Sequence, residues 1–305
     1  MASEKTLLVI AGPTASGKTA LSIALAQHFR APILSFDSRQ CYRELNIGVA
    51  KPSPAELQAV PHYFIGTHSI LEPVDAAGFE KYALETLEQL FQQHDTVVAV
   101  GGTGLYMKVL CEGIDQMPEV PDSIRQSIRQ QYEQEGLPWL QQAIRDEDPV
   151  YAADGEMQNP HRLMRALEIK RASGQSIRHF QQFGKTTRPF RIIKMGIDLP
   201  KPLLHERINQ RVDDMMKAGQ LEEARQLLPY RHLQALQTVG YKELFDYFDG
   251  NCTLAEAIES IKTNTRQYAK RQMTWFRKDK EITWLPDTQP AHYLACFYEQ
   301  TGKIK

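Results

Sequence analysis

Short apolar runs alternate with amphipathic segments along the first 115 residues of the chain. The runs at 6–11, 33–36 and 96–100 are rich in Leu, Ile and Val, which is typical of strands buried on both faces of a parallel sheet. After the first run, apolar residues recur at helical spacing at Leu21, Ala24, Leu25 and Phe29. This alternation predicts an α/β fold in which helices flank a parallel sheet.

The pattern changes between residues 116 and 188, where only helical spacing occurs. Asp122 is a candidate helix cap, because apolar residues follow it about one helical turn apart at Ile124, Ile128 and Tyr132. A second segment repeats the pattern at Leu163, Ala166 and Leu167. We therefore expect an inserted helical domain at 116–188, within a catalytic core formed by 1–115 and 189–305.

Beyond the insertion, the apolar run at 192–199 predicts a further strand, and the remaining residues are mainly helical in pattern. Gly219 is expected to end one helix. Thr253 and Glu256 have the spacing of a capping box for a long helix that reaches about Lys278. Three aromatic residues near the end of this region are expected in the core: Trp275, Phe276 and Trp284.

Composition is that of an ordinary globular protein, with 305 residues of which 42% are hydrophobic. No apolar run approaches the length of about 18 residues that a membrane helix needs, and the first residues lack the pattern of a signal peptide. The four cysteines are scattered without metal-ligand spacing, which predicts reduced thiols. We expect a cytoplasmic protein with no membrane partner, and we expect a monomer.

A formal net charge of −1 conceals a segregation of charge along the chain. Residues 131–156 contain seven acidic side chains and one basic one, whereas residues 157–194 contain nine basic side chains and one acidic one. A basic stretch of this kind is a candidate surface for a nucleic-acid backbone, and its alternative is an ordinary solvated helix face.

The octapeptide GPTASGKT fits the phosphate-binding pattern GxxxxGK[ST], and it lies between a predicted strand and a predicted helix, as this motif requires. In such a P-loop, glycines let successive N–H groups turn toward anionic oxygens, and the lysine adds a positive charge. The fold prediction therefore becomes a P-loop NTPase-like sheet. Thr19 is the expected Mg²⁺ ligand. The predicted diphosphate-binding residues are Gly12, Pro13, Thr14, Ala15, Ser16, Gly17, Lys18 and Thr19.

Two further polar clusters follow predicted strands, at 37–40 and 101–104. The carboxyl ends of parallel strands form the ligand crevice of such a sheet, so these clusters are expected to converge with the P-loop in one pocket.

A P-loop usually binds ATP or GTP, so an NTPase or a small-molecule kinase is one hypothesis. The segment DAAG at 75–78 fits a loose GTPase pattern, but the chain has no NKxD motif for base recognition. No apolar strand ends in a clear second acid for the metal except at Asp37, only 18 residues beyond Thr19.

Four motifs in the same order resemble the tRNA dimethylallyltransferase family: DSRQCYRELNIGVAKP at 37–52, GGTGLY at 101–106, QNPHRLMRALEI at 158–169 and ALQTVGYKEL at 235–244. They span most of the chain, and without a zinc-finger extension it resembles the bacterial form. Asn46 and Val49 replace the family's usual Asp and Thr. The stretch PHYFIG replaces one with two histidines, which leaves the role of His62 open.

The resemblance implies transfer of a dimethylallyl group from dimethylallyl diphosphate to N6 of the adenine 3′ of the anticodon, with release of pyrophosphate. The N6 amine is a poor nucleophile that must lose a proton, so Asp37 is the expected general base. The departing diphosphate gains negative charge, which Lys18, Arg207 and Mg²⁺ are expected to stabilise. Thr103 completes the predicted catalytic set.

The adenine must leave its stack to reach such a pocket, which gives the insertion a role in holding the anticodon stem-loop. The predicted tRNA-binding residues are Asp37, Ser38, Arg39, Gln40, Thr103, Arg125, Gln158, Asn159, Pro160, His161, Arg162, Gln237, Thr238, Val239, Gly240, Tyr241 and Lys242. The basic stretch at 270–280 is expected to add contacts to the stem.

Other interpretations stay open on the sequence alone. An adenylate isopentenyltransferase uses the same donor on free AMP or ADP, and an RNA-binding module could retain a P-loop without catalysis. Asp37 could instead cap a turn. Arg207, and still more Arg211, could form surface ion pairs of little energetic value.

Overall fold

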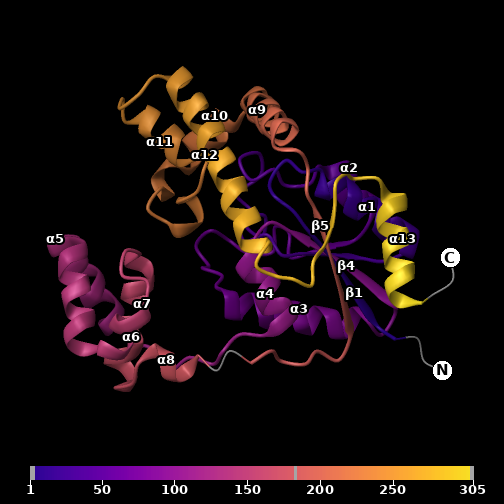
Figure 1. Cartoon of the computed structure of the whole chain (residues 1–305). Coiled ribbons are helices and arrows are strands. Elements are labelled where there is room, and N and C mark those ends of the chain that lie inside the picture. Colours follow the sequence, from indigo (N-terminus) through magenta and orange to yellow (C-terminus); the bar gives the residue numbers. More distant parts are fainter. Residues whose placement is uncertain (1–3, 182–183, 303–305) are drawn as a thin grey trace. The chain divides into compact units, whose positions relative to one another are not determined.

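The computed structural model describes residues 4–181 and 184–302, which form two compact units. The core unit comprises the residues up to Glu112 together with those from Thr187 onward, and the helical unit comprises Gly113–Thr186 (Figure 1). The insertion was expected at 116–188, close to the helical unit's bounds.

The core unit contains one six-stranded sheet in the order β3-β2-β4-β1-β5-β6, and every pair in it is parallel. The strands are β1 Thr6–Ala11, β2 Ile33–Ser35, β3 His62–Tyr63, β4 Thr96–Gly101, β5 Arg191–Ile197 and β6 Thr283–Leu285. The four strands predicted from apolar runs are therefore confirmed. The two edge strands, β3 and β6, were not predicted, because they are short and only partly buried.

Alternate residues of β1 point into two different hydrophobic clusters. Leu7 and Val9 pack with α3 (Ala76–Leu90), α4 (Gly104–Glu112) and α12 (Leu254–Phe276). Leu8 and Ile10 pack with α1 (Lys18–Phe29) and α13 (Pro290–Thr301). Figure 1 shows α1 and α13 on one side of the sheet and α3 and α4 on the other. The sheet is therefore covered on both faces, which explains why its central strands β1 and β4 are mostly apolar.

The remaining helices of the core unit are α2 Pro54–Ala59, α9 Lys201–Lys217, α10 Gln220–Leu227 and α11 Lys242–Phe248. The capping box at Thr253 and Glu256 is confirmed at the start of α12, and Gly219 follows the end of α9 with a left-handed φ of 103°. Phe276 is fully buried, but the expectation for Trp275 was wrong: 37% of this residue is exposed, although its ring lies against Gly104 at the start of α4.

The helical unit contains α5 Asp122–Glu147, α6 Pro149–Asp154, α7 Pro160–Ser173 and α8 Ile177–Phe180, which enclose their own hydrophobic core. Helix α5 is interrupted at Gly136, whose φ is 73°. The prediction that Asp122 caps this helix was wrong. Pro121 occupies the cap position, and its ring fixes a backbone that needs no side-chain bond.

The structure agrees with the predictions made for the cysteines and for membrane helices. All four cysteines are free thiols, and two of them, Cys41 and Cys111, are buried in the core unit. Over residues 4–181 and 184–302, no helix combines the length and the apolar character needed to cross a membrane.

Candidate active site

The P-loop lies between β1 and α1 and leads directly into the amino terminus of that helix. Gly17 is the residue before α1 and has a φ of 91°, and Ala15 also adopts a left-handed φ of 63°. A left-handed backbone conformation is unfavourable for a non-glycine residue such as Ala15, so contacts of the surrounding loop must stabilise it. The resulting turn leads into the amino terminus of α1, whose positive end is suited to an anion.

Lys18 is the first residue of α1 and donates from Nζ to the carbonyl oxygen of Pro13 at 3.1 Å. Burial and the nearby positive charge of Arg211 lower the pKa of Lys18 to about 8, although Asp37 acts in the opposite direction. The ammonium is therefore charged at neutral pH, but the negative charge near it does not offset its burial and the repulsion from Arg211. An anionic ligand would remove this deficit.

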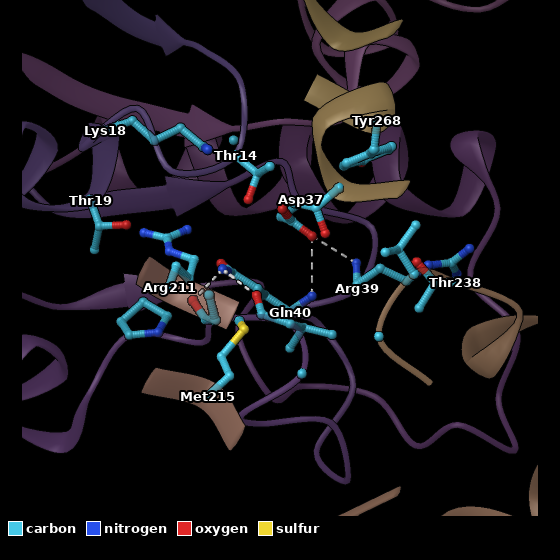
Figure 2. A pocket seen from close by; sticks show the side chains of 18 of the residues that line it. Thr14, Lys18, Thr19, Asp37, Arg39, Gln40, Arg211, Met215, Thr238 and Tyr268 are labelled. Atoms are coloured by element: carbon cyan, nitrogen blue, oxygen red, sulfur yellow. Dashed lines mark hydrogen bonds between the residues drawn. The ribbon is translucent and has the colours of Figure 1, made fainter. Parts of the chain in front are cut away.

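One pocket brings together the P-loop, the segment after β2 and the end of β4, as the sequence predicted (Figure 2). Thr14, Lys18 and Thr19 form one end of its wall, and Asp37, Arg39 and Gln40 line it from the segment after β2. Helices α9 and α12 complete the wall with Arg211, Val212, Met215, Ile261, Thr265, Tyr268 and Gln272. Thr238, Val239 and Gly240 also line it, whereas Thr103 and Arg207 lie outside the lining.

The Asp37 carboxylate is fixed by its own loop. Its Oδ1 accepts hydrogen bonds from the N–H groups of Arg39 at 2.9 Å and Gln40 at 3.3 Å. The turn-capping role considered from the sequence therefore exists, but it uses only one oxygen. Among the described residues, no donor is bonded to Oδ2. The carboxylate is oriented by one oxygen and leaves the other for a ligand.

Thr103 organises the same loop from the neighbouring strand. Its Oγ1 accepts a hydrogen bond from the N–H of Ser38 at 3.0 Å and donates to Ser38 Oγ at 3.2 Å. Both residues of this pair were predicted as ligand contacts. The structure shows that they also hold the segment after β2 against the end of β4.

Gln272 joins two loops of the pocket and was not predicted. Its Oε1 accepts from the N–H of Thr14 at 2.9 Å, and its Nε2 donates to the carbonyl oxygen of Gly102 at 2.8 Å. A Cβ at position 102 would collide with Nε2 of Gln272 and displace this amide. The buried amide therefore ties the P-loop to the loop that carries Thr103.

Two arginines of α9 reach the site in different ways. Arg207 Nη1 donates to the carbonyl oxygen of Ser16 at 3.4 Å and so supports the P-loop from outside. Arg211 lines the pocket itself, so the interpretation of Arg211 as a surface residue was wrong. Burial lowers the pKa of Arg211, with Glu56 acting in the opposite direction. The spacing of four residues places both side chains on one helix face.

The segment from Asn46 to Pro52 forms a further wall of the pocket. The carboxylate of Glu223 on α10 accepts hydrogen bonds from the N–H groups of Asn46, Ile47 and Gly48 and from the hydroxyl of Tyr241. Gln40 Nε2 donates to the carbonyl oxygens of Val49 and Ala50. Residues of the motif at 37–52 and Tyr241 of the motif at 235–244 therefore shape the same wall of the pocket.

Some of the predicted tRNA-binding residues have structural partners. Tyr241 is fully buried with its hydroxyl on Glu223, and Gln237 Nε2 donates to the carbonyl oxygen of Arg231. Lys242 is the first residue of α11.

His62, whose role was left open, lines the pocket, and its Nδ1 forms a hydrogen bond with the carbonyl oxygen of Val60. Burial lowers the pKa of His62, so this ring is neutral at pH 7.

In the helical unit, the predicted segment 158–162 forms the start of α7. Asn159 caps the helix by accepting from the N–H groups of His161 and Arg162, and both of these side chains are exposed. Arg125 is exposed on α5. The basic stretch is partly neutralised by the acidic one, because Arg171 pairs with Glu147 and Arg178 with Asp154.

One group of acids in the core unit is close enough to hold a metal ion: Glu112, Asp279 and Glu281. The Lys194 ammonium lies among them, 2.7 Å from Asp279 and 2.8 Å from Glu281. Burial alone would lower the pKa of Lys194, but the hydrogen bonds to these carboxylates outweigh it and raise the pKa. The positive charge that these acids require is therefore already supplied by the chain.

Comparison with known proteins identifies the family. A family model described as IPP transferase matches residues 40–279. The chain belongs to this family. A relative from Phocaeicola vulgatus named tRNA dimethylallyltransferase 1 is 49% identical over 93% of this chain and 95% of its own length.

Solved structures of the family have the same fold. The full-length tRNA isopentenylpyrophosphate transferase from Bacillus halodurans is 34% identical, with a TM-score of 0.69, and the match covers 93% of this chain and 90% of that one. A eukaryotic dimethylallyltransferase acting on tRNA is 25% identical, with a TM-score of 0.78, over 98% of this chain and 77% of that one. The P-loop NTPase-like fold predicted from the sequence is thus confirmed.

Proposed function

We propose that this chain transfers the dimethylallyl group of dimethylallyl diphosphate to N6 of the adenine 3′ of the anticodon in tRNA and releases pyrophosphate. The observation that carries the proposal is that one pocket contains both the P-loop lysine, Lys18, and the oriented carboxylate of Asp37. The names of its relatives support the same transferase reaction. We place the reaction in the cytoplasm, where tRNA is processed.

The P-loop binds the diphosphate of the donor. Its N–H groups, Lys18 and Arg211 face the pocket with positive charge, and Arg207 holds the loop through Ser16. Thr19 lines the pocket at the start of α1, and its hydroxyl would serve as a ligand for Mg²⁺. When bound, this ion would neutralise charge on the leaving group. The pyrophosphate therefore departs into a site already arranged for an anion.

Asp37 receives the proton from the adenine. As N6 attacks the allylic carbon, the bond from that carbon to the diphosphate oxygen breaks and one N6 proton passes to Oδ2 of Asp37. The Oδ1 bonds to Arg39 and Gln40 keep the carboxylate fixed during this step. The side chains of Arg39 and Thr238 line the pocket and would contact the flipped base or its neighbours. Ser38 lies between Asp37 and Arg39 and would contact the base from the edge of the pocket. Thr103 acts on this contact surface through Ser38.

The helical unit supplies part of the grip on the anticodon stem-loop. Exposed side chains at the start of α7, His161 and Arg162, contact its phosphates and bases, together with Arg125 of α5. On α12 of the core unit, Lys270, Arg271 and the half-exposed Trp275 line a surface hollow that suits the stem. This arrangement combines phosphate contacts with stacking, as RNA loops require.

A single assay separates this proposal from its alternatives. The protein is incubated with Mg²⁺, radiolabelled dimethylallyl diphosphate and either an anticodon stem-loop or free AMP. We expect label in the stem-loop alone. Label in AMP alone would identify an adenylate isopentenyltransferase, and phosphoryl transfer from labelled ATP in a parallel reaction would identify a kinase. RNA binding without either transfer would identify a binding module.

The low pKa of Lys18 predicts a fall in donor capture at alkaline pH. The free enzyme loses the Lys18 charge as pH rises through about 8, so kcat/KM for dimethylallyl diphosphate should decrease about tenfold per pH unit above that value. Bound diphosphate raises the pKa again, so kcat should stay constant to higher pH. The Lys18→Arg variant, which keeps its charge, is the control. A flat kcat/KM profile up to pH 9.5 would contradict this.

Arg162→Ala should weaken stem-loop binding and reduce its dependence on salt. Each phosphate contact contributes a slope of about 0.7 for single-stranded nucleic acid in a plot of log affinity against log salt concentration. We expect a decrease of this size by fluorescence anisotropy. Lys81→Ala, which changes an exposed lysine of α3, is the matched control. An unchanged slope for Arg162→Ala would remove this residue from the RNA contact.

A further inference from the structure

A groove adjoins the active-site pocket between α9 and the segment from Asn46 to Leu57. Its apolar lining comes from Ile47, Pro54 and Leu57, and Ala218 lies at the end of α9. Four residues line both the groove and the pocket: Ala50, Pro52, Arg211 and Met215. These four residues therefore form the partition between the two spaces.

The partition has one adjustable apolar member. Ala50 is held in a left-handed conformation with a φ of 48°, its N–H donates to Ile47, and its carbonyl oxygen accepts from Gln40 at 2.8 Å. Pro52 has no free φ. Met215 has an unbranched side chain with three rotatable bonds, and Figure 2 shows it reaching toward Arg211 and Gln40. Replacing Met215 by a smaller residue would therefore open a passage from the pocket to the groove.

The order of residues along α9 gives the direction in which a donor would lie. Arg207 supports the P-loop, Arg211 lines the pocket with a positive charge, and Met215 follows on the same face one turn later. An allylic diphosphate held by Lys18 and Arg211 would then extend its hydrocarbon end along α9 toward Met215. Each additional carbon of the donor would approach Met215.

We propose that Met215 sets the length of the allylic diphosphate that this enzyme accepts, and that the groove behind it would take the tail of a ten-carbon donor such as geranyl diphosphate. This inference rests on the proposed function. The reaction is otherwise unchanged: the allylic carbon–oxygen bond breaks, the bond from carbon to N6 forms, pyrophosphate leaves and the N6 proton passes to Asp37. Met215 acts by contact with the hydrocarbon chain.

Met215→Ala should therefore gain geranyl transfer. The wild-type protein and the variant are each incubated with Mg²⁺, an anticodon stem-loop and either donor, and the RNA product is identified by mass. We expect geranyl transfer to rise about 10- to 100-fold in Met215→Ala, the range that pocket size contributes to selectivity. Met216→Ala is the matched control, because Met216 packs against the core cluster and lines neither space. It should show no gain.

A second variant tests the route through the groove. Ala218 is exposed and lines only the groove, so Ala218→Phe fills that space without disturbing the core. Added to Met215→Ala, it should abolish the gained geranyl transfer and leave dimethylallyl transfer in place. Inhibition of dimethylallyl transfer by geranyl diphosphate gives an independent readout, and it should strengthen in Met215→Ala by a similar factor.

The failures of this inference and of the proposed function are distinguishable. If the wild-type protein does not transfer dimethylallyl to the stem-loop, the proposed function fails. If it does, and Met215→Ala remains active with dimethylallyl diphosphate but gains neither geranyl transfer nor geranyl inhibition, Met215 does not limit the donor. An equal gain in Met216→Ala, or a gain that survives Ala218→Phe, would also overturn the inference.

Discussion

Asp37→Asn is expected to lower kcat by about 10² to 10⁴, the usual contribution of a general base. The asparagine Oδ1 can still accept from the N–H groups of Arg39 and Gln40, so the turn keeps its cap. The amide that replaces Oδ2 cannot accept the N6 proton. The loss should therefore fall on kcat, and the Kd for the stem-loop should stay within about threefold of wild type.

Asp37→Ala separates the two roles of this side chain. It removes the proton acceptor and the turn cap together, and a lost cap costs about 0.5–2 kcal/mol in related settings. We expect the same loss of kcat with an additional rise in KM. Single-turnover rates with labelled donor and stem-loop measure both effects. If Asp37→Asn retained the wild-type single-turnover rate, the proton would have to leave by another route.

The layered fold could be predicted from the sequence because the central strands carry their own signal. β1 and β4 each have six residues, nearly all of them apolar, since both of their faces are buried. β6 has only three residues, all half-buried, and it is held in the sheet by pairing with Met195, Gly196 and Ile197 of β5. Such an edge strand is specified by a partner almost ninety residues earlier, which local patterns cannot reveal.

The remaining errors in the predicted fold concern the burial of Trp275 on α12 and the cap of α5. Trp275 and Phe276 are neighbours in the sequence, but only Phe276 points into the core, because successive helical residues differ in direction by about 100°. The capping box at Thr253 and Glu256 was predictable, since its hydrogen bonds are local. The cap at Pro121 was not, because the expected carboxylate of Asp122 is not needed there.

The candidate site could be predicted where its residues follow strands, and only there. The P-loop and Asp37 follow β1 and β2, so their convergence on one sheet edge follows from the topology. Gln272 and Tyr268 come from α12, more than 230 residues beyond Asp37, and reach the pocket through tertiary packing. Arg211 had one local signal, its spacing of four from Arg207, which indicates a shared helix face.

Lys18→Met is expected to lower kcat/KM for dimethylallyl diphosphate by about 10² to 10³, the typical loss for one preorganised donor at a developing negative charge. Methionine keeps the length of the side chain and removes its charge at the point where the leaving group departs. Lys108→Met, which changes an exposed lysine of α4, is the matched control and should have no effect. Steady-state rates at pH 7 with saturating stem-loop measure both variants.

The stability of the same variant shows whether the loss is chemical or structural. The pKa of Lys18 is lower in the folded protein than its ordinary value of 10.5, chiefly because burial disfavours the charged form. At pH 7 the charged Lys18 therefore reduces the stability of the fold, and Lys18→Met should relieve this. We expect a melting temperature equal to or above that of wild type despite the loss of activity. A lower melting temperature together with the lost activity would mean that Lys18 mainly holds the loop through Pro13, rather than serving the diphosphate.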